Sequence, residues 1–203
     1  MTSAPIRTLI VDDHPAIRAG VAAVAEEEHD ITVVGTASGE RQLWRTLAVS
    51  GPNVVLMDFE LDGEDGVILC HRLKRRPDAP AVILYSAFAD RTLIAPAMLA
   101  HADALLSKRA SAQVLCGALR DVVQTRSRVP TLPDDQRERL GAMLDEDELS
   151  LAELLLSRRP MPELADVKGM TVEEVEAAAE RLLRRVVAER AHLHGTPSSG
   201  WPA

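Results

Sequence analysis

Residues 53–58 read Asn-Val-Val-Leu-Met-Asp, an apolar run that ends on Asp58, and residues 9–13 read Leu-Ile-Val-Asp-Asp, which ends on Asp12 and Asp13. Short apolar runs of this kind are typical of buried strands. If the two runs form neighbouring parallel strands, all three carboxylates meet at one edge of a sheet. Such crowding is costly unless a cation neutralises the charges. The sequence therefore predicts a Mg²⁺ (or Mn²⁺) site built around one reactive aspartate, Asp58.

Five runs of strand length divide the first 129 residues, at 7–11, 31–36, 53–58, 81–86 and 103–107. Apolar residues between them recur at helical spacing. Strict alternation of strands and helices implies right-handed crossovers and a parallel sheet covered on both faces. We therefore expect a five-stranded, doubly wound, flavodoxin-like α/β domain. Its ligand crevice should lie beyond the carboxyl ends of the strands, where the sequence places Asp12, Asp13, Asp58, Ser86 and Lys108.

These residue types suit phosphoryl transfer. An aspartate carboxylate such as Asp58 can attack phosphorus and hold the group covalently. The transferred group then needs its oxygens neutralised and positioned, for which Lys108 offers a charge and Ser86 a hydroxyl donor. The plainer alternative is that Lys108 only pairs with Asp58 and holds the edge of the sheet together.

The amino-acid composition, 46% hydrophobic and 27% charged, is ordinary for a globular chain, and the length of 203 residues suits one large or two small domains. The N-terminus does not resemble a signal peptide, and no apolar segment approaches membrane-spanning length, so we expect a cytoplasmic protein without membrane contact. Cys70 and Cys116 are isolated and fall in helical patterns. We interpret both as reduced thiols of the core.

A proline-bracketed stretch at 130–133 divides the chain into parts of different charge. Residues 1–129 hold 14 Lys and Arg against 16 Asp and Glu, for a net charge of -2, whereas residues 130–203 hold 9 against 15, for -6. We predict domains at 1–129 and 134–193, with 130–133 as the linker. The tail 194–203 is rich in turn formers and is expected to be disordered.

Four segments of the first part resemble the receiver domain of a two-component response regulator of the NarL/FixJ (LuxR-type) family. They are LIVDDHPAIRAGV at 9–21, NVVLMDFELDGEDG at 53–66, VILYSA at 82–87 and ADALLSK at 102–108. The resemblance implies that Asp58 is the phosphoacceptor and that Asp12, Asp13, Asp58 and the backbone carbonyl of Glu60 hold the metal. It also implies that Ser86 and Lys108 contact the phosphoryl group, which would come from a sensor histidine kinase or a small phosphodonor.

Two positions depart from that family pattern. Receivers of this kind commonly carry an aromatic switch residue three positions before the lysine, where this chain has Leu105. The position usually held by proline, four residues after the phosphoacceptor, is Asp62, within an acidic loop. Crowded carboxylates could raise the pKa of one of them in the metal-free state, so metal affinity should depend on pH.

The second part has a helical pattern throughout, with helices expected at 135–144, 149–156, 162–167 and 171–190. Thr171 and Glu174 have the spacing of a capping box, and Gly169 marks a turn between the last two helices. The segment PELADVKGMTVEEVEAAAERLLRRV at 162–186 resembles the helix-turn-helix output domain of the same family. The resemblance implies a small all-α domain that binds DNA, with the protein as a homodimer.

The first turns of the predicted recognition helix carry acidic residues, Glu173, Glu174 and Glu176, which would repel DNA phosphates. Two hypotheses follow. In the first, a phosphorylation-controlled transcription factor contacts DNA through Lys168, Thr171, Arg181, Arg184 and Arg185, with Arg158 and Arg159 as further phosphate contacts. In the second, the acidic domain binds protein partners or self-associates. Family architecture favours the first, and an enzyme is the weakest hypothesis because no second catalytic constellation appears.

Overall fold

The computed structural model describes residues 4–87, 91–125, 129 and 131–194. The predicted tail beyond residue 194 and Pro130 of the predicted linker lie outside the described residues. Contacts divide the chain into two compact units, residues 1–132 and residues 133–203.

The first unit contains a sheet of five parallel strands, as expected from the alternating runs. Its spatial order is β2-β1-β3-β6-β7, and all four neighbouring pairs are parallel. The strands are β1 (Ile6–Val11), β2 (Ile31–Ala37), β3 (Val54–Asp58), β6 (Ala81–Ser86) and β7 (Ala104–Ser107). The strand order reverses at β1, so the switch point of this doubly wound sheet lies between β1 and β3. The predicted fold class is confirmed.

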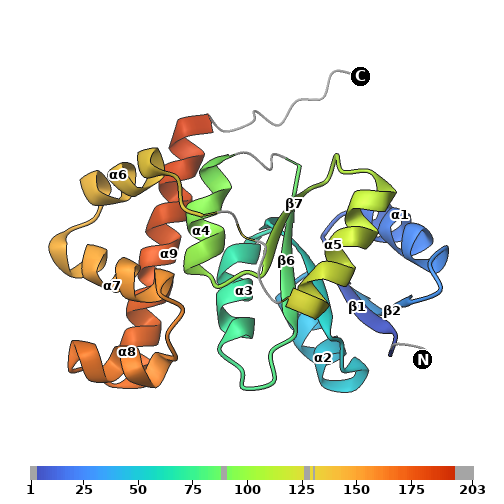
Figure 1. Cartoon of the computed structure of the whole chain (residues 1–203), viewed down its shortest axis with the longest axis horizontal. Coiled ribbons are helices and arrows are strands. Elements are labelled where there is room, and N and C mark those ends of the chain that lie inside the picture. The colour runs from blue at the N-terminus through green and yellow to red at the C-terminus, as the bar shows by residue number, and fades with distance from the viewer. Residues whose placement is uncertain (1–3, 88–90, 126–128, 130, 195–203) are drawn as a thin grey trace. The chain divides into compact units, whose positions relative to one another are not determined.

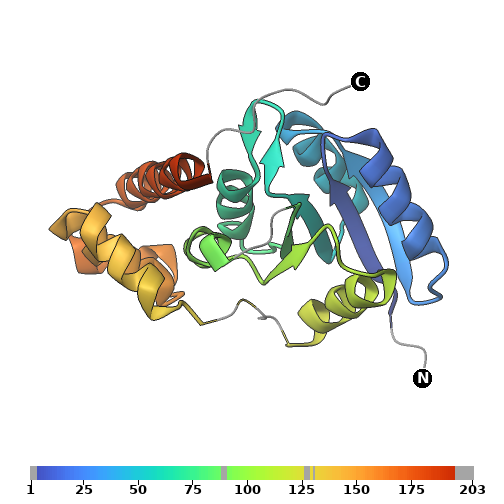
Figure 2. The ribbon, with the colours of Figure 1, turned by 90° about the horizontal axis from the view of Figure 1, so that it is seen from above.

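Helices cover both faces of the sheet (Figures 1 and 2). One face packs against α1 (Pro15–Glu26) and α5 (Ala112–Thr125), whose apolar residues share a buried cluster with alternate residues of the strands. The other face is covered by α2 (Glu40–Ser50), α3 (Gly66–Lys74) and α4 (Ile94–Leu99), the last preceded by a 3-10 turn at Arg91–Leu93. Cys70 in α3 and Cys116 in α5 are buried free thiols, in agreement with their interpretation as core residues.

A small hairpin directly after β3 was not predicted from the sequence. It pairs β4 (Glu60–Leu61) with β5 (Glu64–Asp65) through a turn in which Gly63 has φ +71. A glycine adopts this left-handed conformation without the strain that a side chain would bring. Strands of two residues, here mostly acidic, are too short to form an apolar run like those that predicted the main sheet.

The second unit is helical, as expected. It consists of α6 (Asp134–Met143), α7 (Glu146–Leu156), α8 (Met161–Lys168) and α9 (Val172–His194). The helix expected from residue 149 begins earlier, because the Asp145 carboxylate accepts the Glu148 N–H and Glu148 reaches back to the Asp145 N–H.

The turn between α8 and α9 has the predicted features. Gly169 ends α8 with φ +63, the left-handed conformation that favours glycine. The capping box is also present: Thr171 N–H donates to Glu174 Oε2 at 2.8 Å, and Glu174 N–H donates to Thr171 Oγ1 at 3.2 Å. Residues Val175, Ala179, Leu182 and Leu183 of α9 are buried, so one stripe of the helix packs in the unit and the opposite stripe is exposed.

Candidate functional site

Three predicted carboxylates converge at the carboxyl edge of the sheet. Asp12 follows β1 and Asp58 ends β3, the two neighbouring strands at the switch point. Single ligand atoms of Asp12, Asp13, His14 and Asp58 all lie within 4.8 Å of one another. Asp12 and Asp58 are buried and Asp13 is half-buried. The structure therefore brings together the acidic residues that the sequence placed at separate strand ends.

Lys108 lies between two of these carboxylates. Its ammonium is 2.7 Å from Asp58 Oδ2 and 2.6 Å from Asp12 Oδ2. Burial opposes the positive charge of Lys108, but the hydrogen bonds with Asp12 and Asp58 outweigh burial and raise the pKa of the ammonium. The lysine thus stays charged and compensates part of the negative charge of the cluster.

The Asp58 carboxyl is held in an unusual environment. Burial raises its pKa to about 6; the hydrogen bond and charge of Lys108 act in the opposite direction, and the charge of Asp12 adds to the rise. The sequence predicted a raised pKa from crowding with other carboxylates. The direction is confirmed, although burial is a larger cause than crowding.

The loop after β3 also contacts Asp58. Glu60 N–H donates to Asp58 Oδ1 at 3.2 Å, so the Glu60 peptide lies against the carboxylate. An ideal Cβ built on Gly66 would lie 1.9 Å from the Asp58 carbonyl oxygen, and only glycine fits there. The role of Gly66 was missed from the sequence, because no local pattern shows which distant backbone approaches a residue.

Ser86 and Leu105 lie on the neighbouring strands β6 and β7, Ser86 at the carboxyl edge and Leu105 further in, in register with Leu84. Ser86 ends β6 and is buried, and its carbonyl accepts the Lys108 N–H at 2.8 Å, which fixes the chain after β7. Leu105 lies on β7, half-buried. By strand alternation Ser86 and Leu105 belong to the α3 and α4 face of the sheet, whereas the buried cluster of α1 and α5 takes Ile83, Tyr85, Ala104 and Leu106 from these strands.

His14 is the first residue beyond the acidic pair and the N-cap residue of α1. Its N–H donates to Asp12 Oδ1 at 2.8 Å, and its Nδ1 lies 2.6 Å from Asp13 Oδ1. These contacts agree with a helix-start residue that also orders the carboxylates. Because carboxylate and carbonyl oxygens are the ligands that Mg²⁺ prefers, the donor set of Asp12, Asp13 and Asp58 with a backbone carbonyl fits this ion.

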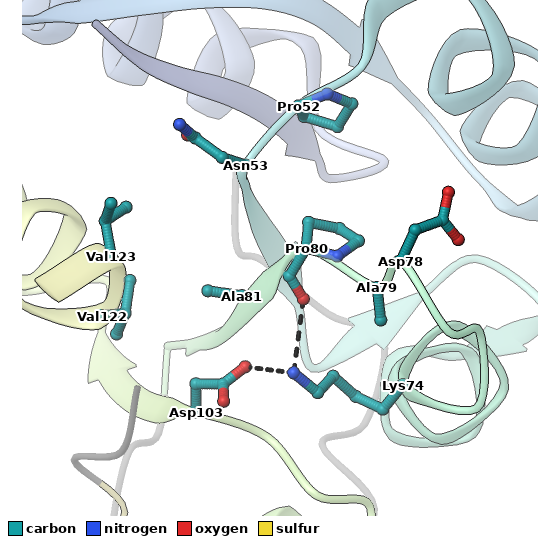
Figure 3. A pocket seen from close by; sticks show the side chains of 10 residues that line it. All are labelled: Pro52, Asn53, Lys74, Asp78, Ala79, Pro80, Ala81, Asp103, Val122 and Val123. Carbon is teal, nitrogen blue, oxygen red and sulfur yellow. Dashed lines mark hydrogen bonds and ion pairs between the residues drawn. The ribbon is translucent and has the colours of Figure 1, made fainter. Parts of the chain in front are cut away.

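A pocket of the first unit lies at the opposite edge of the sheet, where strands β3 and β6 begin (Figure 3). There Lys74 Nζ contacts Asp103 Oδ2 at 2.7 Å and the Pro80 carbonyl at 3.3 Å, and Asp103 Oδ2 also accepts the Val82 N–H. Lys74 and Asp103 of this pocket are thus paired with one another, and the third charged lining residue, Asp78, lies 3.6 Å from Arg76. The pocket is therefore separate from the carboxylate cluster.

In the second unit, the predicted DNA-contacting residues divide into two groups. Arg185 binds Glu148 and the Met143 carbonyl, and Lys168 lies 3.7 Å from Asp147 and bonds Ser150. Arg181 and Arg184 are exposed on the outer stripe of α9, with Arg184 3.7 Å from Glu180. Arg185 and Lys168 thus bind partners on other helices of the unit, although the Arg185 side chain is still 48% exposed.

The acidic residues near the start of α9 also divide. Glu173 is exposed, whereas Glu174 is committed to the capping box, where hydrogen bonds with Thr171 lower its pKa. Thr171 is exposed and completes that box. The outer stripe of α9 is therefore acidic at its start and basic at Arg181 and Arg184.

No helix within the described ranges is both long and apolar enough to cross a membrane.

Comparison with known proteins assigns most of the first unit to one family. The family model of the response regulator receiver domain matches residues 8–120. The transcriptional regulatory protein LiaR of Bacillus subtilis (strain 168) is 34% identical over 115 residues, which cover 57% of this chain and 54% of LiaR. The chain thus matches about half the length of LiaR.

Other relatives align along most of the chain. The response regulator UvrY of Escherichia coli (strain K12) is 24% identical over 200 residues, covering 94% of this chain and 89% of UvrY. Among solved structures, the signal receiver domain of NarL from Mycobacterium tuberculosis superposes with a TM-score of 0.57 at 24% identity, over 61% of this chain and 100% of that one. The RcsB response regulator of Salmonella typhimurium has a TM-score of 0.57 at 16% identity, over 97% and 94%. At these identities the structural matches show the fold alone.

Proposed function

The chain belongs to the response regulator receiver family, and from this premise we propose that Asp58 accepts a phosphoryl group whose presence controls the C-terminal helical unit. Residues 1–129 would be the receiver domain, residues 130–133 the linker, and residues 134–193 the output domain. The phosphodonor would be a sensor histidine kinase or a small acyl phosphate. The observation that carries the proposal is the buried Asp58 carboxylate, bonded to Lys108 and grouped with Asp12 and Asp13.

In the proposed reaction, a carboxylate oxygen of Asp58 attacks the phosphorus of the donor. An O–P bond forms on Asp58, and the donor's own N–P or O–P bond breaks, with the electron pair leaving on the donor. The Lys108 ammonium, 2.7 Å from Asp58 Oδ2 in this structure, would then pair with a negatively charged phosphoryl oxygen. Ser86 would donate its hydroxyl to another oxygen, so that the new negative charge is bound on two sides.

Asp12, Asp13, Asp58 and the Glu60 carbonyl would hold the divalent cation. When bound, Mg²⁺ supplies neutralisation of the phosphoryl oxygens during transfer. Asp12 is positioned for this role by the His14 N–H on its side chain and by Arg18, which donates to its backbone carbonyl at 2.5 Å. These contacts hold the carboxylate at the strand end before any phosphodonor arrives.

Labelling with radioactive acetyl phosphate tests the phosphoacceptor. We expect acid-labile, Mg²⁺-dependent labelling of the wild-type chain and none of Asp58→Asn. Asp62→Asn, which removes a neighbouring exposed carboxylate, should label normally and serves as the matched control. Labelling of the Asp58→Asn protein at the wild-type rate would require a different acceptor.

For the output, we propose DNA binding by a homodimer through the α8–turn–α9 segment. It is supported by the two helices joined at Gly169, by the outward Arg181 and Arg184, and by the resemblance to helix-turn-helix output domains. A relative named as a transcriptional regulator, LiaR, matches the receiver part of the chain. DNA contacts would be made by Arg181, Arg184 and Thr171, with Lys168 and Arg185 contributing where their internal contacts allow.

The acidic start of α9 supports a second candidate, in which this unit binds a protein partner or a second copy of itself. Phosphate contacts release counterions, so true DNA binding gives a negative slope of log affinity on log salt concentration. We expect such a slope with the phosphorylated protein. Absence of binding at low salt, together with association measured by sedimentation, would favour the second candidate.

A further inference from the structure

The single tyrosine of the chain lies beside the carboxylate cluster. Tyr85 is the penultimate residue of β6 and pairs in register with Asp58 of β3 on one side and with Leu106 of β7 on the other. Its backbone carbonyl also accepts the Phe59 N–H at 3.0 Å. The backbone of Tyr85 is thus tied to the strand and to the loop that carry the phosphoacceptor.

Strand alternation gives Tyr85 a side-chain direction shared with the functional residues. The buried cluster under α1 and α5 takes Ile10 from β1, Leu56 from β3, Ile83 from β6 and Ala104 from β7. Successive side chains of a strand point to opposite faces, so a step of two along β1, β3 and β6 reaches Asp12, Asp58 and Tyr85. Lys108 directly follows β7, and its ammonium lies 2.6 Å from Asp12 and 2.7 Å from Asp58. Asp12, Asp58 and Tyr85 therefore belong to one face at the carboxyl edge, and the Lys108 ammonium reaches both carboxylates of that face.

The ring of Tyr85 lies close to the Lys108 ammonium, with Nζ 5.9 Å from the ring centroid. Tyr85 is buried, with 7% of its surface exposed, and the Lys108 side chain is 12% exposed. A cation near an aromatic face is attracted by the ring quadrupole, and more strongly where water is excluded. Asp12, Asp58 and Tyr85 thus surround the same ammonium, the first two with negative charge and the third with an aromatic face.

We infer that Tyr85 is a positioning residue that holds the Lys108 ammonium between Asp12 and Asp58, and the inference rests on the phosphoacceptor role proposed above. The flexible four-carbon stem of lysine needs such a contact, because two carboxylates fix the charge but not the path of the chain that brings it there. The ring of Tyr85 restricts the conformation of the Lys108 side chain on the face of the sheet that packs against α1 and α5. Leu105, on the opposite face, offers no aromatic contact of this kind.

Phosphorylation kinetics with four proteins test the inference: wild type, Tyr85→Leu, Lys108→Ala and the double variant. Rate constants are measured with acetyl phosphate and Mg²⁺. Removing the ring should lower the labelling rate roughly twofold to tenfold in the wild-type background and leave it unchanged in the Lys108→Ala background. Tyr85→Phe, which keeps the ring, should label within about twofold of wild type.

Unfolding curves of all variants separate positioning from loss of folding, and Tyr85→Met replaces Tyr85→Leu if the latter does not fold. A spectroscopic measurement adds a direct readout. The ring current of Tyr85 should shift the NMR signals of the Lys108 ε-methylene, and the shift should survive in Tyr85→Phe and vanish in Tyr85→Leu.

Equal labelling rates for wild type and Tyr85→Leu would overturn the inference, as would a loss of equal size in the Lys108→Ala background. Both results leave the phosphoacceptor role intact, because wild type still labels on Asp58. Absence of Asp58 labelling in wild type would instead overturn the proposed function, and Tyr85 would then position Lys108 beside a carboxylate that does not react.

Discussion

The ammonium of Lys108 lies 2.7 Å from Oδ2 of Asp58, and both side chains are largely buried. This ion pair joins the ends of β3 and β7 across the intervening strand β6. A change in the charge or size of the group on Asp58 therefore changes the contacts of Lys108 and of the chain that follows β7.

Replacing Lys108 with Ala should separate phosphorylation from its consequence. Asp58 remains as the nucleophile, so labelling by acetyl phosphate should persist, but phosphorylation should no longer change the oligomeric state measured by sedimentation. Stability should fall by about 2–4 kcal/mol, because two buried carboxylates lose their cation. Lys74→Ala removes a similarly buried ion pair with Asp103 at the opposite edge and should lower stability while leaving the phosphorylation response in place.

Asp58→Asn should stabilise the metal-free protein near neutral pH. The pKa of the Asp58 carboxyl is raised to about 6 in the folded state from an ordinary value of 3.8. The folded state therefore binds the proton more tightly than the unfolded state, and stability is lost as the pH rises from about 4 through about 6. The loss should be roughly 3 kcal/mol at most.

Denaturant unfolding of both proteins in EDTA, from pH 4 to pH 8, checks this prediction. The difference between wild type and Asp58→Asn isolates the contribution of one carboxyl from the other titrating groups. A difference in stability that stays constant with pH would mean that water reaches the Asp58 carboxyl in solution and that its pKa is not raised.

Mg²⁺ should stabilise the chain, since it binds the folded site and not the separated residues of the unfolded state. The ion must displace the Asp58 proton, so the stabilisation should weaken as the pH falls below about 6. Asp13→Asn should weaken Mg²⁺ affinity roughly tenfold or more, as measured by the dependence of the unfolding midpoint on Mg²⁺ concentration. Asp62→Asn, an exposed carboxylate of the same region, should behave like wild type.

Gly66→Ala should destabilise the receiver unit by about 2–4 kcal/mol and slow phosphorylation. The added Cβ would meet the Asp58 carbonyl oxygen at 1.9 Å, so the backbone that carries the phosphoacceptor must move. Gly117→Ala is the matched control, because the position lies within α5 and no atom is within 4 Å of its ideal Cβ. Unfolding curves should show no loss for this control, and a loss for both variants would contradict the steric explanation.

Arg181→Ala and Arg185→Ala should have different effects if the second unit binds DNA. Arg181 is exposed on the outer stripe of α9, so its removal should reduce the salt slope of DNA binding by about one phosphate contact without loss of stability. Arg185 binds Glu148 and the Met143 carbonyl. Its removal should lower stability by about 1 kcal/mol or less, because the site is half exposed. Identical salt slopes for wild type and Arg181→Ala would exclude this arginine from the interface.

Much of the fold could be predicted from the sequence because buried parallel strands leave continuous apolar runs and amphipathic helices leave a periodic pattern. The five strands appeared within a residue or two of the expected runs, as β3 at Val54–Asp58 illustrates. The capping box of Thr171 and Glu174 was also predictable, since both partners lie within one helical turn. The β4–β5 hairpin was not predictable, because each of its strands has only two residues and forms no apolar run.

The sequence by itself determined which polar residues stand at the strand ends, and thereby brought Asp12, Asp13, Asp58 and Lys108 to one edge of the sheet. That prediction was possible because the alternation of strands with helices and the right-handed crossovers leave few possible strand orders for the sheet. Only the tertiary structure decided the side-chain partners: Tyr85 beside Lys108, Gly66 against the Asp58 carbonyl, and Arg185 paired with Glu148. Such contacts depend on register and packing between residues far apart in the chain, and no local spacing encodes them.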